Sequence, residues 1–487
     1  MSDTGKFKKS LNLFDSTAIT IGSMIGSGIF IVSADIARGV GSPGWLLAIW
    51  AITGIMTVLA ALAYGELACM LPHAGGIYVY LREAYSPLFG FLYGWTLFLV
   101  IQCGTIAAVG MAFAKYSGVF IPWISDQNML FDFGRIHLNT TQLVSILLIL
   151  FLTWINMRGV DYGKKIQNIF TYSKIFILLI FVVIGIYAAS QTKLQVFGSV
   201  DFWTASKASA DGTQTPLAGI ALMIALGTSM VGSLFAADAW YNATYTADEV
   251  INPKKTIPRS LFLGTLAVSL VYFLVNIVYV VALPLHGSPD GATVMDRGIQ
   301  FASEDRVATA AIYGIFGSTA TIIMALVVVI STFGCNNGIV LAGARVFYAM
   351  AKDGLFFKKT GTLNKNGVPA FSLGIQAVWS ILLCFSGTYN QLLDYVMFAA
   401  IIFYILTIGS VFMLRKKRPD VERPYKAFGY PVLPLIYILV CFLIIVVLLI
   451  EKPDFTWPGL IIVFTGIPVY YLWKRFSTVK IGVNEGV

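Results

Sequence analysis

Two short segments of the chain combine glycine, serine and apolar residues in a pattern that predicts broken helices. Residues 22–28 read GSMIGSG and residues 232–238 read GSLFAAD, so both begin with Gly-Ser and two apolar residues. Glycine and serine are poor helix formers, and a break leaves backbone N–H and carbonyl groups without helical partners. Free N–H groups at the start of a helix suit a carboxylate, and free carbonyls suit an ammonium group. A zwitterionic amino acid carries both groups on one carbon atom.

Two ionisable residues could add charge to such a site. Asp238 closes the second segment, where it could accept an amine, pair with a cationic side chain, be protonated or cap the following half-helix. Lys174 lies about eight residues, or roughly 12 Å, into an apolar run, so it either faces a partner inside the protein or extends its stem to the water interface. Glu66 is followed by Pro72 and is expected near a helix end, bonded to the adjoining loop.

Apolar stretches that could hold these residues inside a membrane cover nearly the whole chain. Of its 487 residues, 57% are hydrophobic and 12% are charged, against about 25% charged in soluble proteins. A membrane-spanning helix needs about 20 apolar residues. Twelve spans are predicted, at about 16–39, 44–71, 88–117, 142–160, 166–190, 217–248, 260–284, 307–334, 370–388, 391–414, 431–450 and 458–474. The fold class is therefore an all-α polytopic membrane protein.

The cytoplasmic side can be predicted from the distribution of Lys and Arg. With both termini in the cytoplasm, 24 of the 33 Lys and Arg residues fall on that side, 8 fall outside and Lys174 lies within a span. This is the bias of the positive-inside rule, and it predicts a multi-pass protein of the cell (inner) membrane. The basic run at 415–418 is interpreted as a cytoplasmic anchor, with anionic-lipid binding as the alternative. Segment 335–358 is expected to end the eighth span and continue as an interfacial helix, with Arg345, Lys352 and Asp353 on its polar side.

The two predicted breaks fall in the first and sixth spans, five spans apart. Paired interruptions at corresponding positions indicate an inverted-repeat transporter with its site at the membrane midplane. In hydrocarbon, each unsatisfied backbone group costs several kcal/mol, so a break is tolerated where it lines a wet or ligand-filled cavity. The alternative is close helix packing, since Gly22 and Gly26 are four residues apart.

Other functional classes find little support in the composition. The net charge of +9 is spread over short loops, so no nucleic-acid partner is expected. The five cysteines lie in or beside apolar segments at no metal-binding spacing, so neither a metal, a cofactor nor a disulfide framework is expected. No HExxH, CxxC or Ser/His/Asp constellation falls within the spans, so the protein is not expected to be an enzyme. A channel would need a repeated filter, and none is found.

Three blocks of residues, in order along most of the chain, resemble the amino acid–polyamine–organocation (APC) superfamily. Residues 22–30 resemble its first-span signature, and the block from Tyr64-Gly65-Glu66-Leu67 to Tyr85 resembles its second span and first loop. Residues 235–240 (FAADAW), followed by Glu249, resemble the sixth-span block of the L-type amino acid transporter branch. The resemblance implies one transporter domain, residues 1–487, with a LeuT-type five-plus-five inverted repeat and interrupted helices 1 and 6. Repeat one would cover about 16–190, repeat two about 217–414, and two additional helices about 431–474.

The same resemblance assigns six residues at the breaks to the substrate: Met24, Gly26, Ser27, Gly28, Phe235 and Asp238. Amides of the glycine-rich segment would hold the substrate carboxylate. Carbonyls near Met24 and Phe235 would hold its amine, and the Phe235 ring would close over it. Many L-type relatives have glycine in place of Asp238, whereas relatives that take dibasic amino acids and cystine look similar there. Cationic substrates therefore stay open beside neutral ones, and Gln102 is a further candidate pocket residue.

Lys174 matches the fifth-span lysine that replaces a sodium ion in many relatives, with Ser331 or Thr332 as its partner on the eighth span. The function implied is sodium-independent amino acid exchange. A proton-coupled symporter is the alternative within transport, and a membrane-embedded amino acid sensor is the alternative of another class. The external loop after span three lacks the cysteine that heteromeric members use to attach a heavy subunit. The expected partners are therefore amino acids and membrane lipids, without a disulfide-linked subunit.

Overall fold

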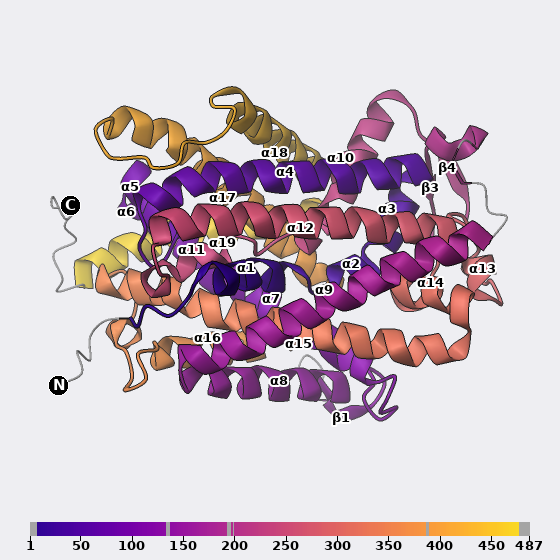
Figure 1. Cartoon of the computed structure of the whole chain (residues 1–487), viewed down its shortest axis with the longest axis horizontal. Coiled ribbons are helices and arrows are strands. Elements are labelled where there is room, and N and C mark those ends of the chain that lie inside the picture. Colours follow the sequence, from indigo (N-terminus) through magenta and orange to yellow (C-terminus); the bar gives the residue numbers. More distant parts are fainter. Residues whose placement is uncertain (1–6, 133–136, 192–195, 198, 386–388, 477–487) are drawn as a thin grey trace.

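The computed structural model is a bundle of long helices that run roughly side by side, with one helix crossing the others obliquely (Figure 1). It describes residues 7–132, 137–191, 196–197, 199–385 and 389–476. Within these ranges, eleven helical segments are long and apolar enough to cross a membrane, and the apolar helix α16 (Ala370–Leu383) is shorter. Each of the twelve predicted spans overlaps one of them, although the eighth, predicted at about 307–334, lies later in the chain at Thr321–Lys352. The prediction of a twelve-helix membrane protein is therefore confirmed.

The first part of the bundle contains the first five spans. Its helices are α1 (Leu13–Met24), α2 (Gly28–Ile31), α3 (Ser33–Val40), α4 (Pro43–Met70), α5 (Ile77–Ala84), α6 (Pro87–Thr96), the π-helical η1 (Leu97–Ile101), α7 (Gln102–Ser117), α8 (Thr140–Met157) and α9 (Val160–Gln191). The obliquely placed helix in Figure 1 is α9. Helix α1 begins where a capping box forms, because the Asn12 side chain accepts from the Asp15 N–H and the Asp15 carboxylate accepts from the Asn12 N–H.

The second part contains the other seven spans. Its helices are α10 (Gly219–Ala236), α11 (Asn242–Tyr245), η3 (Ala247–Glu249), α12 (Pro253–Ala282), α13 (Val294–Arg297), η4 (Ser303–Asp305), α14 (Val307–Phe316), α15 (Ser318–Lys352), η5 (Lys358–Gly361), α16, α17 (Tyr389–Lys417), α18 (Val432–Glu451) and α19 (Pro453–Phe476). Helix α12 packs along α4 in the middle of the bundle. The five-plus-five repeat itself stays a prediction.

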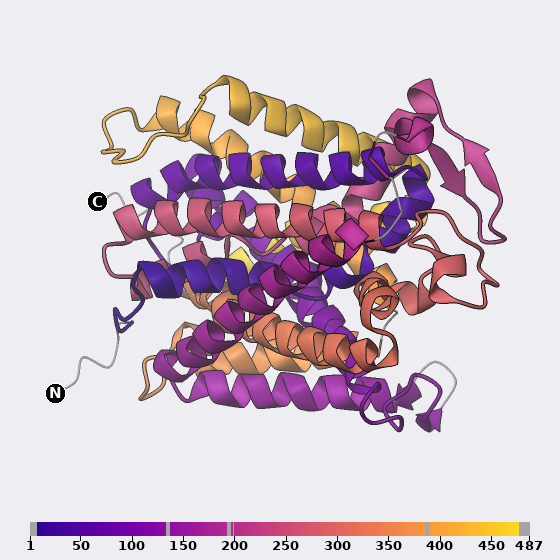
Figure 2. The ribbon, with the colours of Figure 1, turned by 45° about the vertical axis from the view of Figure 1, so that its right-hand side comes forward.

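Two small antiparallel hairpins lie at one end of the bundle, opposite the start of α1 (Figures 1 and 2). They pair β1 (Met129–Asp132) with β2 (His137–Asn139), and β3 (Ser206–Ala208) with β4 (Gln214–Pro216), and η2 (Val200–Trp203) precedes the second. Both fall in loops that were expected on the external side.

The predicted break in the first span is confirmed. Helix α1 ends at Met24, the next residue is extended, and α2 begins at Gly28. The sixth span breaks as well, because α10 ends at Ala236 and the chain then turns through Ala239, which has a positive φ of 62°. The helical path resumes only with the short α11. Both interruptions therefore occur where the glycine-rich and alanine-rich segments predicted them.

The prediction of an interfacial helix at 335–358 is wrong. Helix α15 continues without interruption to Lys352, over 35 residues. Arg345, which was expected on a polar surface, is 1% exposed and forms an ion pair with Glu249. A charge that is neutralised inside the protein can lie on a buried helix, so Arg345 did not mark an interface.

Candidate binding site at the helix breaks

The two breaks face each other across a small cavity. Its volume is about 20 Å³, which is room for a molecule the size of water. All six residues that the sequence assigned to the substrate line it: Met24, Gly26, Ser27, Gly28, Phe235 and Asp238. Thr105 of α7 and Cys335 and Ile339 of α15 close the remaining sides. An amino acid is larger than this space, so its binding requires the half-helices or the lining side chains to move apart.

The half-helices touch because glycine allows it. A Cβ atom on Gly28 would lie 2.6 Å from the Cβ and 2.8 Å from the Cα of Ala236. A Cβ atom on Gly26 would lie 2.9 Å from the Cys335 Sγ. From Gly28 the backbone stays helical through Val32 into α3, so the amide end of a continuous helical segment points at the cavity. The glycines therefore fit both interpretations of the sequence, the helix break and the close packing of helices, because they break the helix and let the two segments pack closely.

Lys174 is fully buried and does not reach the water interface. Its Nζ donates to the Gly22 carbonyl at 2.6 Å and to the Ile25 carbonyl at 2.5 Å. The Ser331 hydroxyl of α15 reaches the same Ile25 carbonyl at 3.1 Å and the Gly26 carbonyl at 3.2 Å. Spans one, five and eight thus meet at the carbonyl end of α1. The interpretation of Lys174 as a residue that faces a partner inside the protein agrees with this geometry.

Tyr272 of α12 is a site residue that the sequence analysis missed. Its hydroxyl lies 3.0 Å from the Met24 carbonyl and 3.1 Å from the Ala236 carbonyl, so one side chain joins the last residues of α1 and α10. The Met24 carbonyl, expected to hold an amine, is therefore already bonded in this conformation. A buried tyrosine in an apolar helix resembles any packing residue, and only the meeting of the two helix ends reveals its role.

Asp238 is buried against tyrosines. Its carboxylate accepts a hydrogen bond from the Tyr404 hydroxyl of α17, and the Tyr241 hydroxyl lies 3.5 Å away. The short α11 has Tyr241 at its N-cap and no side-chain capping bond, so the capping interpretation of Asp238 is not what the structure shows. Further hydroxyls gather beside this group, where Tyr93 and Tyr245 bond to each other. One carboxylate therefore stands within an otherwise neutral, polar cluster at the cavity.

We expect Asp238→Gly to change the substrate ranking. Loss of the carboxylate removes an acceptor for a cationic side chain or amine, so the preference for cationic over neutral amino acids should fall roughly tenfold. The measurement is a competition panel of cationic and neutral amino acids against one labelled substrate. Asp248→Gly is the matched control, because Asp248 lies in η3 away from the cavity. An unchanged ranking would assign Asp238 a structural role only.

The remaining two predicted residues are placed away from the cavity. The Gln102 amide donates to the Ile339 carbonyl at 2.7 Å and joins α7 to α15 behind the lining. The Thr332 hydroxyl bonds to carbonyls of its own helix, at Val328 and Val329. Of the two candidates on span eight, Ser331 is therefore the one that contacts the break. It shares the Ile25 carbonyl with Lys174, but the described partners of the Lys174 Nζ are backbone carbonyls and not the hydroxyl of Ser331 or Thr332 that was expected.

Comparison with known proteins identifies the family of this chain. A family model described as Amino acid permease matches residues 11–472. The chain belongs to this family. It is 30% identical to the human large neutral amino acids transporter small subunit 2. The 470 aligned residues are 96% of this chain and 80% of the relative. The mouse b(0,+)-type amino acid transporter 1 is 29% identical over 483 residues, 97% of this chain and 90% of the relative. The mouse Asc-type amino acid transporter 1 is 28% identical over 480 residues, which are 97% of this chain and 82% of the relative.

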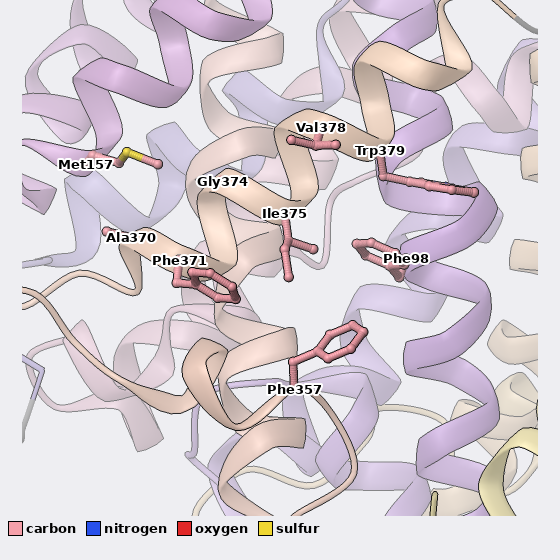
Figure 3. Close-up of a pocket in the computed structure, with 9 residues that line it drawn as sticks. All are labelled: Phe98, Met157, Phe357, Ala370, Phe371, Gly374, Ile375, Val378 and Trp379. Carbon is pink, nitrogen blue, oxygen red and sulfur yellow. The ribbon is translucent and has the colours of Figure 1, made fainter. Parts of the chain in front are cut away.

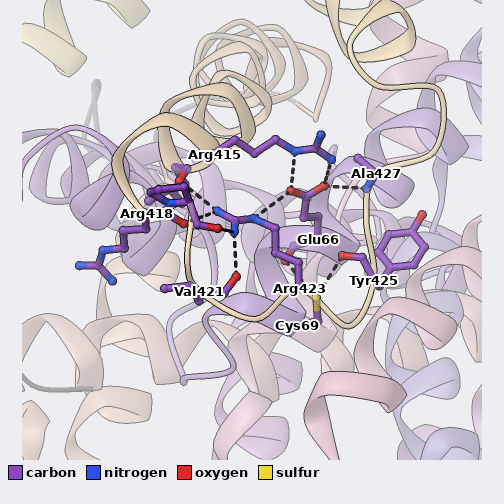
Figure 4. A network of polar contacts seen from close by, with 10 residues as sticks. Glu66, Cys69, Arg415, Arg418, Val421, Arg423, Tyr425 and Ala427 are labelled. Atoms are coloured by element: carbon purple, nitrogen blue, oxygen red, sulfur yellow. Dashed lines mark hydrogen bonds and ion pairs between the residues drawn. The ribbon is translucent and has the colours of Figure 1, made fainter.

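Away from its cavity, this amino acid permease has a second buried carboxylate, Glu66 of α4. Arg415 of α17 donates to it from two guanidinium nitrogens, Nε at 2.8 Å and Nη2 at 2.6 Å. The backbone N–H of Ala427 also donates to it, at 2.6 Å (Figure 4). Arg423 adds a longer contact of 3.5 Å. Glu66 therefore fastens the loop after α17 to the end of α4. The sequence analysis placed it correctly near a helix end, but its partners belong to this distant loop and not to the adjoining loop at Pro72.

The basic run at 415–418 is largely bound by the protein itself. Besides Arg415, Lys417 donates to the Ala84 carbonyl at 2.7 Å, and Arg418 pairs with Glu83. Lys416 is exposed, and it is the one residue of the four for which no side-chain contact is described. In the permease, this run holds α5 against α17. Carboxylates pair with Arg415 and Arg418, whereas Lys416 and Lys417 are exposed and have no carboxylate partner among the described contacts.

A third network lies at the same end of the permease and is almost completely buried. Arg345 Nε donates to Glu249 at 2.8 Å and Arg345 Nη2 donates to the second carboxylate oxygen at 3.2 Å, with both side chains 1% exposed. Burial raises the pKa of Glu249, and the neighbouring guanidinium opposes that rise. The carbonyl of Glu249 also accepts from the N–H groups of Ser10 and Leu11, both at 2.9 Å. A buried charge pair and backbone pairing therefore join η3, α15 and the segment before α1 at this end of the bundle.

Proposed function

We propose that this permease is a sodium-independent amino acid exchanger that takes neutral and, through Asp238, cationic amino acids. The observation that carries the proposal is the meeting of the two broken helices at one cavity. The amide end at Gly28 suits the carboxylate, and the carbonyl end near Ala236 suits the amine. The relatives named as transporters of large neutral and b(0,+)-type amino acids support this substrate class. No covalent chemistry is needed for such a cycle.

The position of Lys174 supports independence from sodium. Its ammonium group occupies the carbonyls of Gly22 and Ile25, which are hard oxygen ligands of the kind that a small cation would use. A fixed positive charge at these oxygens makes a second cation there unfavourable. The charge that sodium would bring is supplied by the chain.

We further propose that both termini face the cytoplasm. The start of α1 lies at the end opposite the hairpins, and with this orientation 24 of the 33 Lys and Arg residues fall on the cytoplasmic side. We also propose that the permease works without a disulfide-linked partner, although a relative is named as a small subunit. All five cysteines are buried and free, so none presents a thiol to another chain.

Exchange can be tested in proteoliposomes. We expect labelled amino acid to enter only vesicles that were loaded with unlabelled amino acid, at the same rate in sodium and in choline buffers and with or without a pH gradient. The stoichiometric release of internal amino acid would be measured in parallel. Uptake into empty vesicles that follows the proton gradient would contradict exchange and favour the proton-coupled symporter. Binding without any flux would favour the sensor.

A further inference from the structure

A second, larger groove lies on the outside of the bundle, away from the substrate cavity. It has a volume of about 490 Å³ and lies between α16, the end of α8 and the segment that leads into η5 (Figure 3). Phe98, Phe357, Phe371, Ile375 and Trp379 point their side chains around it. The lining is thus aromatic and aliphatic on every described side.

The groove offers hydrocarbon and no polar partner. The only N–H in its lining side chains, Trp379 Nε1, donates to the Leu99 carbonyl at 3.0 Å among the described contacts. Phe357, Phe371 and Val378 are 50%, 43% and 60% exposed, so the groove opens on the surface that faces the membrane. An occupant must therefore be apolar where it enters, and burial of each methylene there is favourable. A lipid acyl chain has this chemistry.

Basic residues adjoin the lining residues of the groove in the sequence. Phe357 is followed directly by Lys358 and Lys359, and Lys359 Nζ lies 5.9 Å from the centre of the Phe371 ring. At the other edge, Met157 is followed by Arg158. The loop that carries Lys365 is tied to this edge, because the Asn364 amide donates to the Met157 carbonyl at 2.9 Å.

This positive charge is not offset nearby. Residues 354–369 contain three lysines and no Asp or Glu. The two acids that flank the region are used elsewhere, because Asp353 binds Tyr78 and Arg82, and Asp161 pairs with Lys8 at 2.8 Å. The mouth therefore keeps a net positive charge next to an apolar groove.

We propose that this groove binds one anionic phospholipid of the adjacent leaflet. One acyl chain occupies the groove between Phe371 and Trp379, and the phosphate lies between the lysine pair at 358–359 and Arg158. Basic pockets between membrane helices recognise lipid headgroups in this way, and each lysine near an anionic group adds to the affinity. A second copy of the chain is a poorer occupant, because a symmetric contact would place the same cations against one another.

The test uses the purified full-length protein in detergent and native mass spectrometry, with phosphatidylglycerol as the probe and phosphatidylcholine of the same acyl chains for comparison. We expect wild type to bind phosphatidylglycerol at least tenfold more tightly than phosphatidylcholine. The double variant Lys358→Ala/Lys359→Ala should lose at least tenfold in phosphatidylglycerol affinity, about fivefold for each charge. Lys416→Ala/Lys426→Ala is the matched control, because it removes two exposed lysines, one from the last turn of α17 and one from the loop that follows, and should change nothing.

Gly374→Leu tests the groove itself. A Cβ atom there meets only the Met157 Cε, at 3.6 Å, so the leucine side chain would extend into the groove and should reduce binding of phosphatidylglycerol to the same extent. Thermal melting of each variant checks that it is folded. Equal binding of both lipids, an equal loss in the control, or unchanged binding in Gly374→Leu would overturn the proposal. Dimers that disappear in the lysine variant would also overturn it, in favour of a contact between copies.

Discussion

Exchange by Lys174→Met should be about a hundredfold slower than by wild type. Methionine keeps the length and the apolar stem of the side chain but removes both donors from the carbonyls of Gly22 and Ile25. Hydrogen bonds that involve a charged group contribute about 1.5–3 kcal/mol each, and about 1.4 kcal/mol corresponds to a tenfold change. The break in α1 would then no longer be held in its binding geometry. The measurement is the initial rate of amino acid exchange, normalised to the amount of reconstituted protein.

The control for this substitution is on the same helix. Lys165→Met changes an exposed lysine nine positions earlier in α9 and should leave exchange within about twofold of wild type. We expect Lys174→Met to stay folded, because removal of a buried charge also removes its desolvation cost. A rate close to wild type in Lys174→Met would show that the side chain only fills space, and the account of the first break would fail.

Glu249→Gln should strongly destabilise the protein. It leaves the guanidinium of Arg345 buried without its carboxylate, and loss of one partner of a buried pair costs about 3–5 kcal/mol. In detergent, we expect the melting temperature to fall on the order of 5 °C or more. The double variant Glu249→Gln/Arg345→Met should recover much of the loss, because no unpaired charge remains in the interior.

An exposed ion pair at the same end supplies the comparison. Lys254 and Glu422 lie 3.1 Å apart with side chains 50% and 74% exposed, so Glu422→Gln should cost less than about 1 kcal/mol. The melting temperature of this variant should therefore stay near that of wild type. If Glu249→Gln and Glu422→Gln melted at the same temperature, or if the double variant were no better than Glu249→Gln, the buried pair would not stabilise this end of the bundle.

The membrane spans and the two breaks were predictable because their physical signals are local. Hydropathy identifies an apolar helix within about 20 residues, and the glycines at 22, 26 and 28 mark the first break without knowledge of its neighbours. Lys174 was also identified, since a lysine in an apolar run needs a partner. What the local pattern could not tell was which carbonyl it reaches.

The errors and omissions concern pairs that lie far apart in the chain. Arg345 was assigned to an interface because its partner, Glu249, is 96 residues away. Tyr272 was overlooked because a tyrosine in an apolar helix carries no signal until the ends of α1 and α10 meet at its hydroxyl. Gln102 was given to the pocket, and its actual partner is a backbone carbonyl of α15. Such contacts depend on tertiary packing, which a one-dimensional pattern does not contain.

The strand-like pairing before α1 has a mechanical consequence. Leu11 and Val250 form a parallel bridge, in which the Ile251 N–H donates to the Leu11 carbonyl at 2.8 Å and the Leu11 N–H donates to the Glu249 carbonyl. The segment that enters the first interrupted helix is thereby latched to the segment that leaves the sixth. The two cannot swing outward independently while these bonds hold, whichever cargo lies between them. The free energy needed to separate the two segments therefore depends partly on main-chain hydrogen bonds, which side-chain substitutions alone do not remove.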